Sequence, residues 1–260
     1  MGKNTASKSE VKKGWKIFGK VLLSLIWVFA SVIASQLVVG FIMVLLLGSE
    51  KFTQPVWTAV YSALVYLVAL ALVVLVPHVI YKQHHKSAEL STSRRELGLI
   101  GLPTWADIGL APVGFIVYLL LAAGLTAIFS IFPWFNAVEA QDTGFSIYVM
   151  GFDRIVAFVT LVIIAPIAEE IIFRGWLYAK LRRFLGQGVS EAWSIILSIL
   201  IVSVLFGAVH MQWNVGVNVF AMSVVLCGLR EVTGTIHAGI LLHMLKNGVA
   251  FYLLYVVGMG

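Results

Sequence analysis

The sequence predicts an all-α membrane protein: a polytopic helical bundle of about seven transmembrane spans, with six to eight as the range. Of the 260 residues, 60% are hydrophobic and 12% are charged, and the mean hydropathy is +0.99. A soluble domain is about half apolar and about a quarter charged, so this composition indicates a membrane protein. Long apolar stretches alternate with polar segments along the chain. Because a helix needs about 20 apolar residues to cross a bilayer, each of these stretches is a predicted span.

The chain divides into three predicted parts. Residues 1–20 form a basic cytoplasmic segment, disordered at first and then interfacial. Residues 21–94 hold two spans and a basic cytoplasmic loop, and residues 95–260 hold the core. The first apolar stretch is too long for a signal-peptide core, so we expect an uncleaved span. The seven predicted spans are 21–47, 56–80, 108–132, 152–180, 192–210, 215–229 and 235–257, of which 215–229 is short and therefore expected to be tilted, broken or partial.

The distribution of lysine and arginine predicts the orientation of the bundle. With the N-terminus inside, most of the 18 Lys and Arg fall on the inner side, whereas the outer loop 133–151 contains none. This bias predicts an integral, multi-pass protein of the plasma membrane with a cytoplasmic N-terminus. The same grouping explains the net charge of +6 without nucleic-acid binding. Cys227 is the single cysteine, which excludes an intramolecular disulfide.

Ionisable residues inside the apolar second half of the chain are the residues that indicate a function. They form Glu169-Glu170-x-x-x-Arg174, Phe206-x-x-x-His210 and His243-x-x-x-Asn247. A charge at membrane depth costs about 2.5 to 3.5 kcal/mol on insertion scales, so such residues are retained for a task. The combination of carboxylates, imidazoles and a carboxamide points to hydrolytic chemistry within a bilayer.

The spacing within the first motif predicts different roles for its two carboxylates. Glu170 and Arg174 are i,i+4 neighbours on one helix face, which favours a buried ion pair. Glu169 is rotated by about 100° from Glu170 and is left to face a cavity as a base. Glu169 and His210 reach compatible depths only if the helix continues past Arg174 to the basic cluster at 180–183. We therefore expect a buried Arg174 and a long helix, kinked at Pro166.

Lys246 is a further cation near the middle of the last predicted span. One interpretation pairs it with Glu170 or with a backbone carbonyl. The other makes it a candidate substrate contact, either holding a substrate carboxylate or depressing the pKa of a neighbouring group.

The three motifs resemble those of the CPBP family of intramembrane proteases. This family includes the CAAX prenyl proteases of the Rce1 type and the bacterial bacteriocin-processing and immunity proteins (Abi family). Arg95-Glu-Leu-Gly98-Leu, followed by Trp105 and an apolar span, is similar to the family's approach to its core. The resemblance covers about residues 95–257 and does not extend to the first two spans, whereas Lys246 departs from the pattern.

The resemblance implies a role for each motif residue. Glu169 and His210 would activate the water that attacks the scissile carbonyl. His243 and Asn247 would hydrogen-bond the oxyanion, and Glu170 and Arg174 would support the site. A carboxylate in apolar surroundings suits a general base, and fixed donors in a dry cavity stabilise an oxyanion.

The cofactor prediction is either none or zinc. The family is commonly labelled metalloprotease, and Glu169, His210 and His243 would be the ligands of a three-ligand zinc site. A His-Glu-x-x-His helix is absent from the sequence, and an asparagine is a poor zinc ligand. We therefore favour direct activation of water by Glu169 and His210.

The predicted function is an intramembrane endopeptidase, of metallo- or glutamate type, acting on a membrane-associated peptide or lipidated protein. The substrate would be a prenylated CAAX-type or a bacteriocin-like one, and the other partner is the lipid bilayer. A non-catalytic scaffold, immunity or regulatory protein that binds a partner is the alternative. A proton-coupled transporter is the third possibility, although the chain lacks the paired broken helices or inverted repeats that would favour one.

Overall fold

The computed structural model of the chain describes residues 8–52, 54–84, 90–139, 141 and 150–258. All regular structure in these residues is helical, and seven helical segments are long and apolar enough to cross a membrane. The protein is thus an all-α, multi-pass integral membrane protein, and the predicted fold class is confirmed. The seven segments are Lys8–Leu47, Pro55–Tyr81, Trp105–Phe129, Gly151–Leu185, Glu191–Ala208, Trp213–Thr233 and His237–Val257.

Several spans combine α-helical and π-helical stretches, the latter denoted η. The second span joins α3, η1 and α4, the fourth joins α6, η2, α7, η3 and α8, and the last joins α11 and η4. The elements are α1 (Lys8–Leu47), α2 (Ser49–Phe52), α3 (Pro55–Leu70), η1 (Ala71–Leu75), α4 (Val76–His84), α5 (Trp105–Phe129), α6 (Gly151–Phe158), η2 (Val159–Ile164), α7 (Ala165–Glu169), η3 (Glu170–Leu177), α8 (Tyr178–Leu185), α9 (Glu191–Ala208), α10 (Trp213–Thr233), α11 (His237–Tyr252) and η4 (Leu253–Val257).

Two predicted boundaries are wrong. The first helix begins at Lys8, so residues 8–14 are helical where disorder was expected; residues 1–7 lie outside the described part. Lysine is a good helix former, and a polar sequence is compatible with a helix that extends beyond the membrane. The predicted short span 215–229 is a full helix of 21 residues, α10. Its apolar run is interrupted by polar residues with partners of their own, as Asn218 shows by accepting a 2.6 Å bond from Tyr118.

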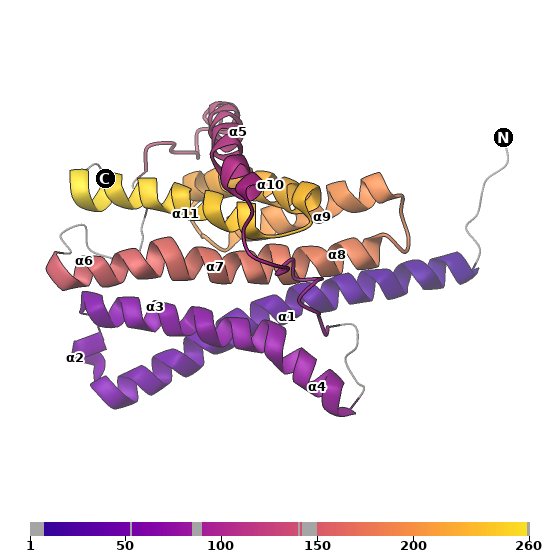
Figure 1. Ribbon diagram of the computed structural model, residues 1–260, viewed down its shortest axis with the longest axis horizontal. Helices are drawn as coiled ribbons and strands as arrows, with labels where there is room; N and C mark the ends of the chain where they lie inside the picture. The colour runs from indigo at the N-terminus through magenta and orange to yellow at the C-terminus, as the bar shows by residue number, and fades with distance from the viewer. Residues whose placement is uncertain (1–7, 53, 85–89, 140, 142–149, 259–260) are drawn as a thin grey trace.

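The fourth span lies at the centre of the bundle (Figure 1). On one side, α1 and α3 pack against each other, α1 against η3 and α8, and α3 against α6, η2 and α7. On the other side, α11 packs against η2 and α7, while α9 and α10 reach η3. Glu169 and Glu170, at the junction of α7 and η3, are therefore enclosed by helices from both ends of the chain.

Pro166 lies between two π-helical stretches, η2 and η3. A proline lacks the N–H that an α-helix would use, and π-type turns accommodate a local change of hydrogen bonding. The helix nevertheless continues from Gly151 to Leu185. The expected continuation past Arg174 is thus confirmed, and the perturbation expected at Pro166 takes the form of a changed hydrogen-bond pattern on both sides of it.

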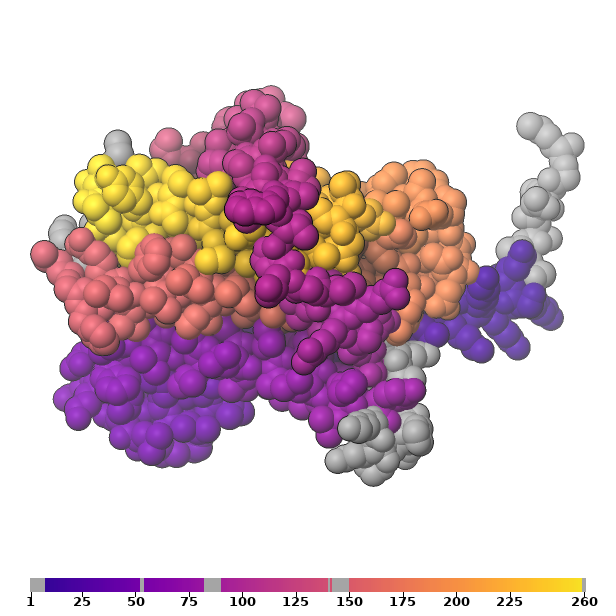
Figure 2. All heavy atoms as spheres, in the orientation of Figure 1, coloured from indigo at the N-terminus to yellow at the C-terminus, as the bar shows by residue number. Residues whose placement is uncertain are grey.

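The segment from Leu90 to Thr104 crosses the surface before entering α5 (Figure 2). Trp176 Nε1 donates to the Leu90 carbonyl at 3.1 Å, and Arg230 Nη2 donates to the Glu96 carbonyl at 2.8 Å. Gly98 has a φ of +72°, and a Cβ at this position would lie 2.9 Å from the Arg230 guanidinium carbon. The segment resembling the family's approach to its core therefore ties η3 and α10 together.

A close backbone contact near the motifs joins α9 to α10. A Cβ on Gly207 would lie 2.7 Å from the Gly216 carbonyl oxygen. Small residues allow helix backbones to approach in membranes, where packing drives association. This contact fixes the turn that carries His210.

Candidate active site

Glu169 ends α7 with its side chain 15% exposed. The Tyr66 hydroxyl donates to Glu169 Oε1 at 2.6 Å. The other oxygen, Oε2, lies 3.6 Å from His243 Nε2. One carboxylate oxygen is therefore taken by a strong donor, and the other faces an imidazole from beyond hydrogen-bonding distance.

Glu170 and Arg174 form the expected ion pair directly behind Glu169. Arg174 Nη1 lies 2.9 Å from Glu170 Oε1, and both side chains are completely buried. The Arg174 guanidinium also lies over the Phe206 ring of α9, 4.3 Å from its centroid. A buried charge needs such partners, so the pair and the ring explain how Arg174 persists in the interior.

His243 lies between the two carboxylates. Its Nδ1 donates to Glu170 Oε1 at 3.0 Å, while its Nε2 faces Glu169 Oε2. Glu170 is held as a carboxylate by Arg174 and can only accept, which places a proton on Nδ1. The rotation of about 100° between adjacent helix residues thus brings the two carboxylates to opposite nitrogens of one imidazole.

His210 lies in the turn after α9, which ends at Ala208, two residues before the predicted end of this span. Its Nδ1 donates to the Phe206 carbonyl at 2.8 Å, which leaves Nε2 as an acceptor. Burial lowers the pKa of the His210 imidazole, which favours this neutral form. Phe206 lies between the motifs, its ring centroid 5.3 Å from that of His210 and 6.0 Å from that of His243.

Asn247 and Lys246 follow His243 on α11. Asn247 Nδ2 donates to the Leu161 carbonyl of η2 at 2.9 Å, which leaves its second N–H available. Lys246 is half-buried and interacts electrostatically with Glu169 and with His210. The interpretation that pairs Lys246 with Glu170 does not match the geometry, because the bonded partners of Glu170 are Arg174 and His243.

A zinc site made by Glu169, His210 and His243 does not fit this arrangement. Zinc requires its ligand atoms to converge at about 2 Å from one point. Among the described residues, no group of three or more His, Cys, Asp or Glu side chains is placed to hold a metal ion. His243 and His210 use Nδ1 for Glu170 and for the Phe206 carbonyl, so Nε2 is the nitrogen that each ring leaves without such a bond.

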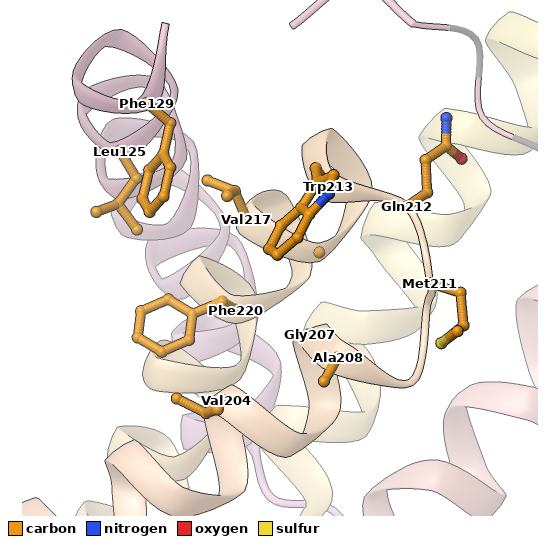
Figure 3. Close-up of a pocket in the computed structure, with 11 residues that line it drawn as sticks. Leu125, Phe129, Val204, Gly207, Ala208, Met211, Gln212, Trp213, Val217 and Phe220 are labelled. Carbon is orange, nitrogen blue, oxygen red and sulfur yellow. The ribbon is translucent and has the colours of Figure 1, made fainter. Parts of the chain in front are cut away.

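An apolar pocket of about 800 Å³ opens beside the His210 turn. In Figure 3, Leu125 and Phe129 of α5 face Trp213, Val217 and Phe220 of α10 across this space. Its floor includes Gly207 and Ala208, and Met211 and Gln212 lie on the connection that follows His210. The pocket is of the size that accommodates a small organic ligand, about 300 to 1,000 Å³.

Tyr66 is the neighbour of Glu169 that sequence reasoning missed. It lies on α3, in one of the two spans that bore no resemblance to the family. A tyrosine in an apolar helix is common, and nothing in its local sequence distinguishes it from a packing residue. Only the packing of α3 against α7 brings the hydroxyl to the carboxylate.

Comparison with known proteins supports this assembly of motifs. The sequence model of the family described as type II CAAX prenyl endopeptidase, Rce1-like, matches residues 151–249. The matched region runs from the start of α6 into α11 and includes all three motifs. No curated protein and no solved structure gives a match. Over residues 151–249, the chain is therefore similar to the Rce1-like family of type II CAAX prenyl endopeptidases.

Proposed function

We propose that the protein is an intramembrane endopeptidase of glutamate type, in which Glu169 and His210 activate water and His243 and Asn247 stabilise the oxyanion. The observation that carries the proposal is the graded burial of the site. Glu170 and Arg174 are fully buried, whereas the Glu169 side chain beside them is 15% exposed. Within the described part of the chain, Glu169 Oε2 has no hydrogen-bond donor within 3.5 Å. An accessible carboxylate oxygen next to imidazoles is what a general base requires.

The first step activates water. Glu169 Oε2 accepts a proton from a water molecule, and the water oxygen attacks the carbonyl carbon of the scissile bond. His210 supports the step through Nε2, which accepts a hydrogen bond because its Nδ1–H is engaged with the Phe206 carbonyl. The proton then passes to the leaving nitrogen, so that the C–N bond breaks into a new carboxylate and a new amine.

The second requirement is a set of donors for the oxyanion. His243 is oriented by its bond to Glu170, so Nε2 faces the same space as Glu169 Oε2. When this ring carries its second proton, Nε2–H donates to the oxyanion. The free N–H of Asn247 is the other donor, with the side chain held at the Leu161 carbonyl. Such preoriented donors contribute about 3 to 4 kcal/mol each in hydrolases.

The apolar pocket supports a lipidated substrate. Its lining residues are almost entirely aliphatic or aromatic, and it lies next to the His210 turn. A hydrocarbon chain bound there would lie beside the turn that carries His210. The family name refers to prenylated CAAX substrates, and we extend that class, or a bacteriocin-like membrane peptide, to this chain. The cytoplasmic N-terminus and plasma-membrane location predicted from the lysine and arginine distribution belong to the same proposal.

The test is a search for new peptide termini in membranes that express the full-length protein. Wild type is compared with Glu169→Gln, which keeps the size of the side chain and removes the base. We expect termini that form only with the wild type and that identify the substrate. The matched control is Glu191→Gln at the start of α9, a carboxylate with 86% of its side chain exposed, which should retain every such terminus.

The outcomes separate the functional classes. If Glu169→Gln and wild type give the same termini at equal protein levels, the protein is not a protease of this mechanism. If cells that express Glu169→Gln also keep the phenotype of cells that express the wild type, a scaffold role replaces the catalytic one.

A further inference from the structure

The shortest side-chain bond to Glu169 comes from outside the matched region. Tyr66 Oη donates to Glu169 Oε1 at 2.6 Å. Tyr66 belongs to α3, whereas the family match begins at residue 151. The contact therefore joins the catalytic candidate to the N-terminal pair of spans, which carries none of the three motifs.

Packing fixes Tyr66 in this position. The helix α3 lies along the fourth span and contacts α6, η2 and α7 (Figure 1). Thr160 Oγ1 donates to the Ala59 carbonyl at 3.4 Å, two turns before Tyr66 on the same helix. Ala59 itself is completely buried, so the small side chain allows the two helices to approach. A displacement of α3 would thus move the hydroxyl away from Glu169.

The hydroxyl divides the two oxygens of Glu169 between different tasks. Oε1 accepts the Tyr66 O–H, and Oε2 remains on the side of His243 Nε2. A carboxylate held at one oxygen cannot rotate freely about its last torsion, which is otherwise broad. The bond therefore keeps Oε2 directed to the space where water and the scissile carbonyl must meet.

We propose that Tyr66 is a positioning residue for the reaction, holding Glu169 through Oε1 so that Oε2 serves as the base. This inference rests on the proposed function. It makes the N-terminal spans part of the catalytic unit, because α3 supplies a contact that residues 151–249 do not contain. If the Tyr66 hydroxyl bonded to Glu169 only to have a hydrogen-bond partner in the interior, its removal would not change the rate of cleavage.

The structure provides a matched control for that distinction. Tyr118 of α5 donates to Asn218 Oδ1 of α10, also at 2.6 Å and also between two spans. Tyr66→Phe and Tyr118→Phe each delete one hydroxyl that makes a short bond across the bundle. Only the first deletion removes a bond to Glu169.

The experiment compares the two variants with wild type, using purified full-length protein in proteoliposomes. The probe is a fluorogenic peptide that reproduces the strongest Glu169-dependent cleavage site found in the search for new termini. We expect Tyr66→Phe to lower kcat about tenfold or more, in line with the loss of a bond to a charged group. KM should stay within about twofold, because Tyr66 acts on the base rather than on the bound substrate. Tyr118→Phe should leave kcat unchanged.

Thermal unfolding supplies a readout without substrate. The unfolding midpoints of wild type, Tyr66→Phe, Glu169→Gln and the double variant form a cycle that measures the coupling between the two side chains. We expect the effects to be non-additive. Additive midpoints would show that the two groups do not interact.

The other possible results also decide whether Tyr66 has a positioning role. A Tyr66→Phe protein that cleaves as fast as wild type, or a loss of kcat equal to that of Tyr118→Phe, overturns the positioning role while leaving the proposed function intact. Failure of Tyr66→Phe alone to accumulate would make the hydroxyl a folding requirement, which also overturns it. A wild type with no Glu169-dependent termini removes the proposed function, and this inference with it.

Discussion

Replacing Arg174 by methionine tests how the interior tolerates the charge of Glu170. Methionine is similar in length and apolar, so the substitution removes the cation while largely filling its space. It leaves the Glu170 carboxylate completely buried, with the His243 N–H as its hydrogen-bond donor. The variant therefore isolates the contribution of the buried ion pair behind the site.

The magnitude follows from the burial of both partners. Removing one partner of a buried pair costs about 3 to 5 kcal/mol, because the remaining charge has lost its compensation. The loss of the guanidinium over the Phe206 ring, at 4.3 Å, acts in the same direction. At about 2 to 4 °C for each kcal/mol in a protein of this size, Arg174→Met should unfold about 6 to 20 °C below wild type.

Thermal unfolding of the purified full-length protein in detergent, followed by tryptophan fluorescence, measures this shift. Glu170→Gln combined with Arg174→Met removes both charges and should recover at least half of the loss. The control is Arg183→Met, whose arginine makes a partly exposed pair with Glu96 at 3.2 Å. Such a surface pair contributes at most about 1 kcal/mol.

Two results would refute this reasoning. An Arg174→Met protein that unfolds at the same temperature as Arg183→Met would show that the buried charge is compensated without the arginine. A double variant less stable than Arg174→Met alone would show that packing, and not charge, sets the stability of this region.

The remaining predictions concern the substrate, the cofactor and the helix contact below His210. Lys246→Met should raise the KM of the Glu169-dependent cleavage, because we expect the cation to hold a substrate carboxylate; unchanged steady-state kinetics would dispose of that role. Dialysis against a chelator should leave the cleavage rate unaltered, and a loss that added zinc restores would contradict the glutamate mechanism. Gly207→Ala should destabilise the protein by about 1 to 3 kcal/mol, because the new Cβ would lie 2.7 Å from the Gly216 carbonyl oxygen. Gly228→Ala, with no described neighbour within 4 Å of the new Cβ, should not destabilise it, and equal unfolding midpoints for the two variants would speak against a tight contact.

The parts of the fold that follow from local physics could be predicted from the sequence. The number of spans depends on hydropathy and length, so the apolar stretches of the chain are enough to indicate seven segments. The boundaries depend on less local effects. The helix α1 begins at Lys8 because a helix can continue into water where hydropathy ends. The helix α10 extends beyond the predicted span at both ends, and within it Asn218 accepts a bond from Tyr118 of another span.

The site shows the same division between local and non-local information. The i,i+4 spacing of Glu170 and Arg174 predicted a contact within one helix, and that contact is present. The position of His243 between two carboxylates depends on how α11 packs against α7, which no local pattern encodes. The Tyr66 contact is even harder to predict from the sequence, because it joins two helices and Tyr66 lies outside the motifs altogether.

The order of burial across the site shows which of its charged groups is the most accessible. Arg174 and Glu170 are fully buried, the His243 side chain is 3% exposed, and that of Glu169 is 15% exposed. Arg174 pairs with Glu170, and Glu170 also accepts the N–H of His243. The helix α3 supplies the donor for one oxygen of Glu169. The other oxygen is where the series ends, and the proposed function places the proton transfer from water there. An apolar bundle tolerates these ionisable groups because each of the buried ones has a charged or polar partner inside the bundle.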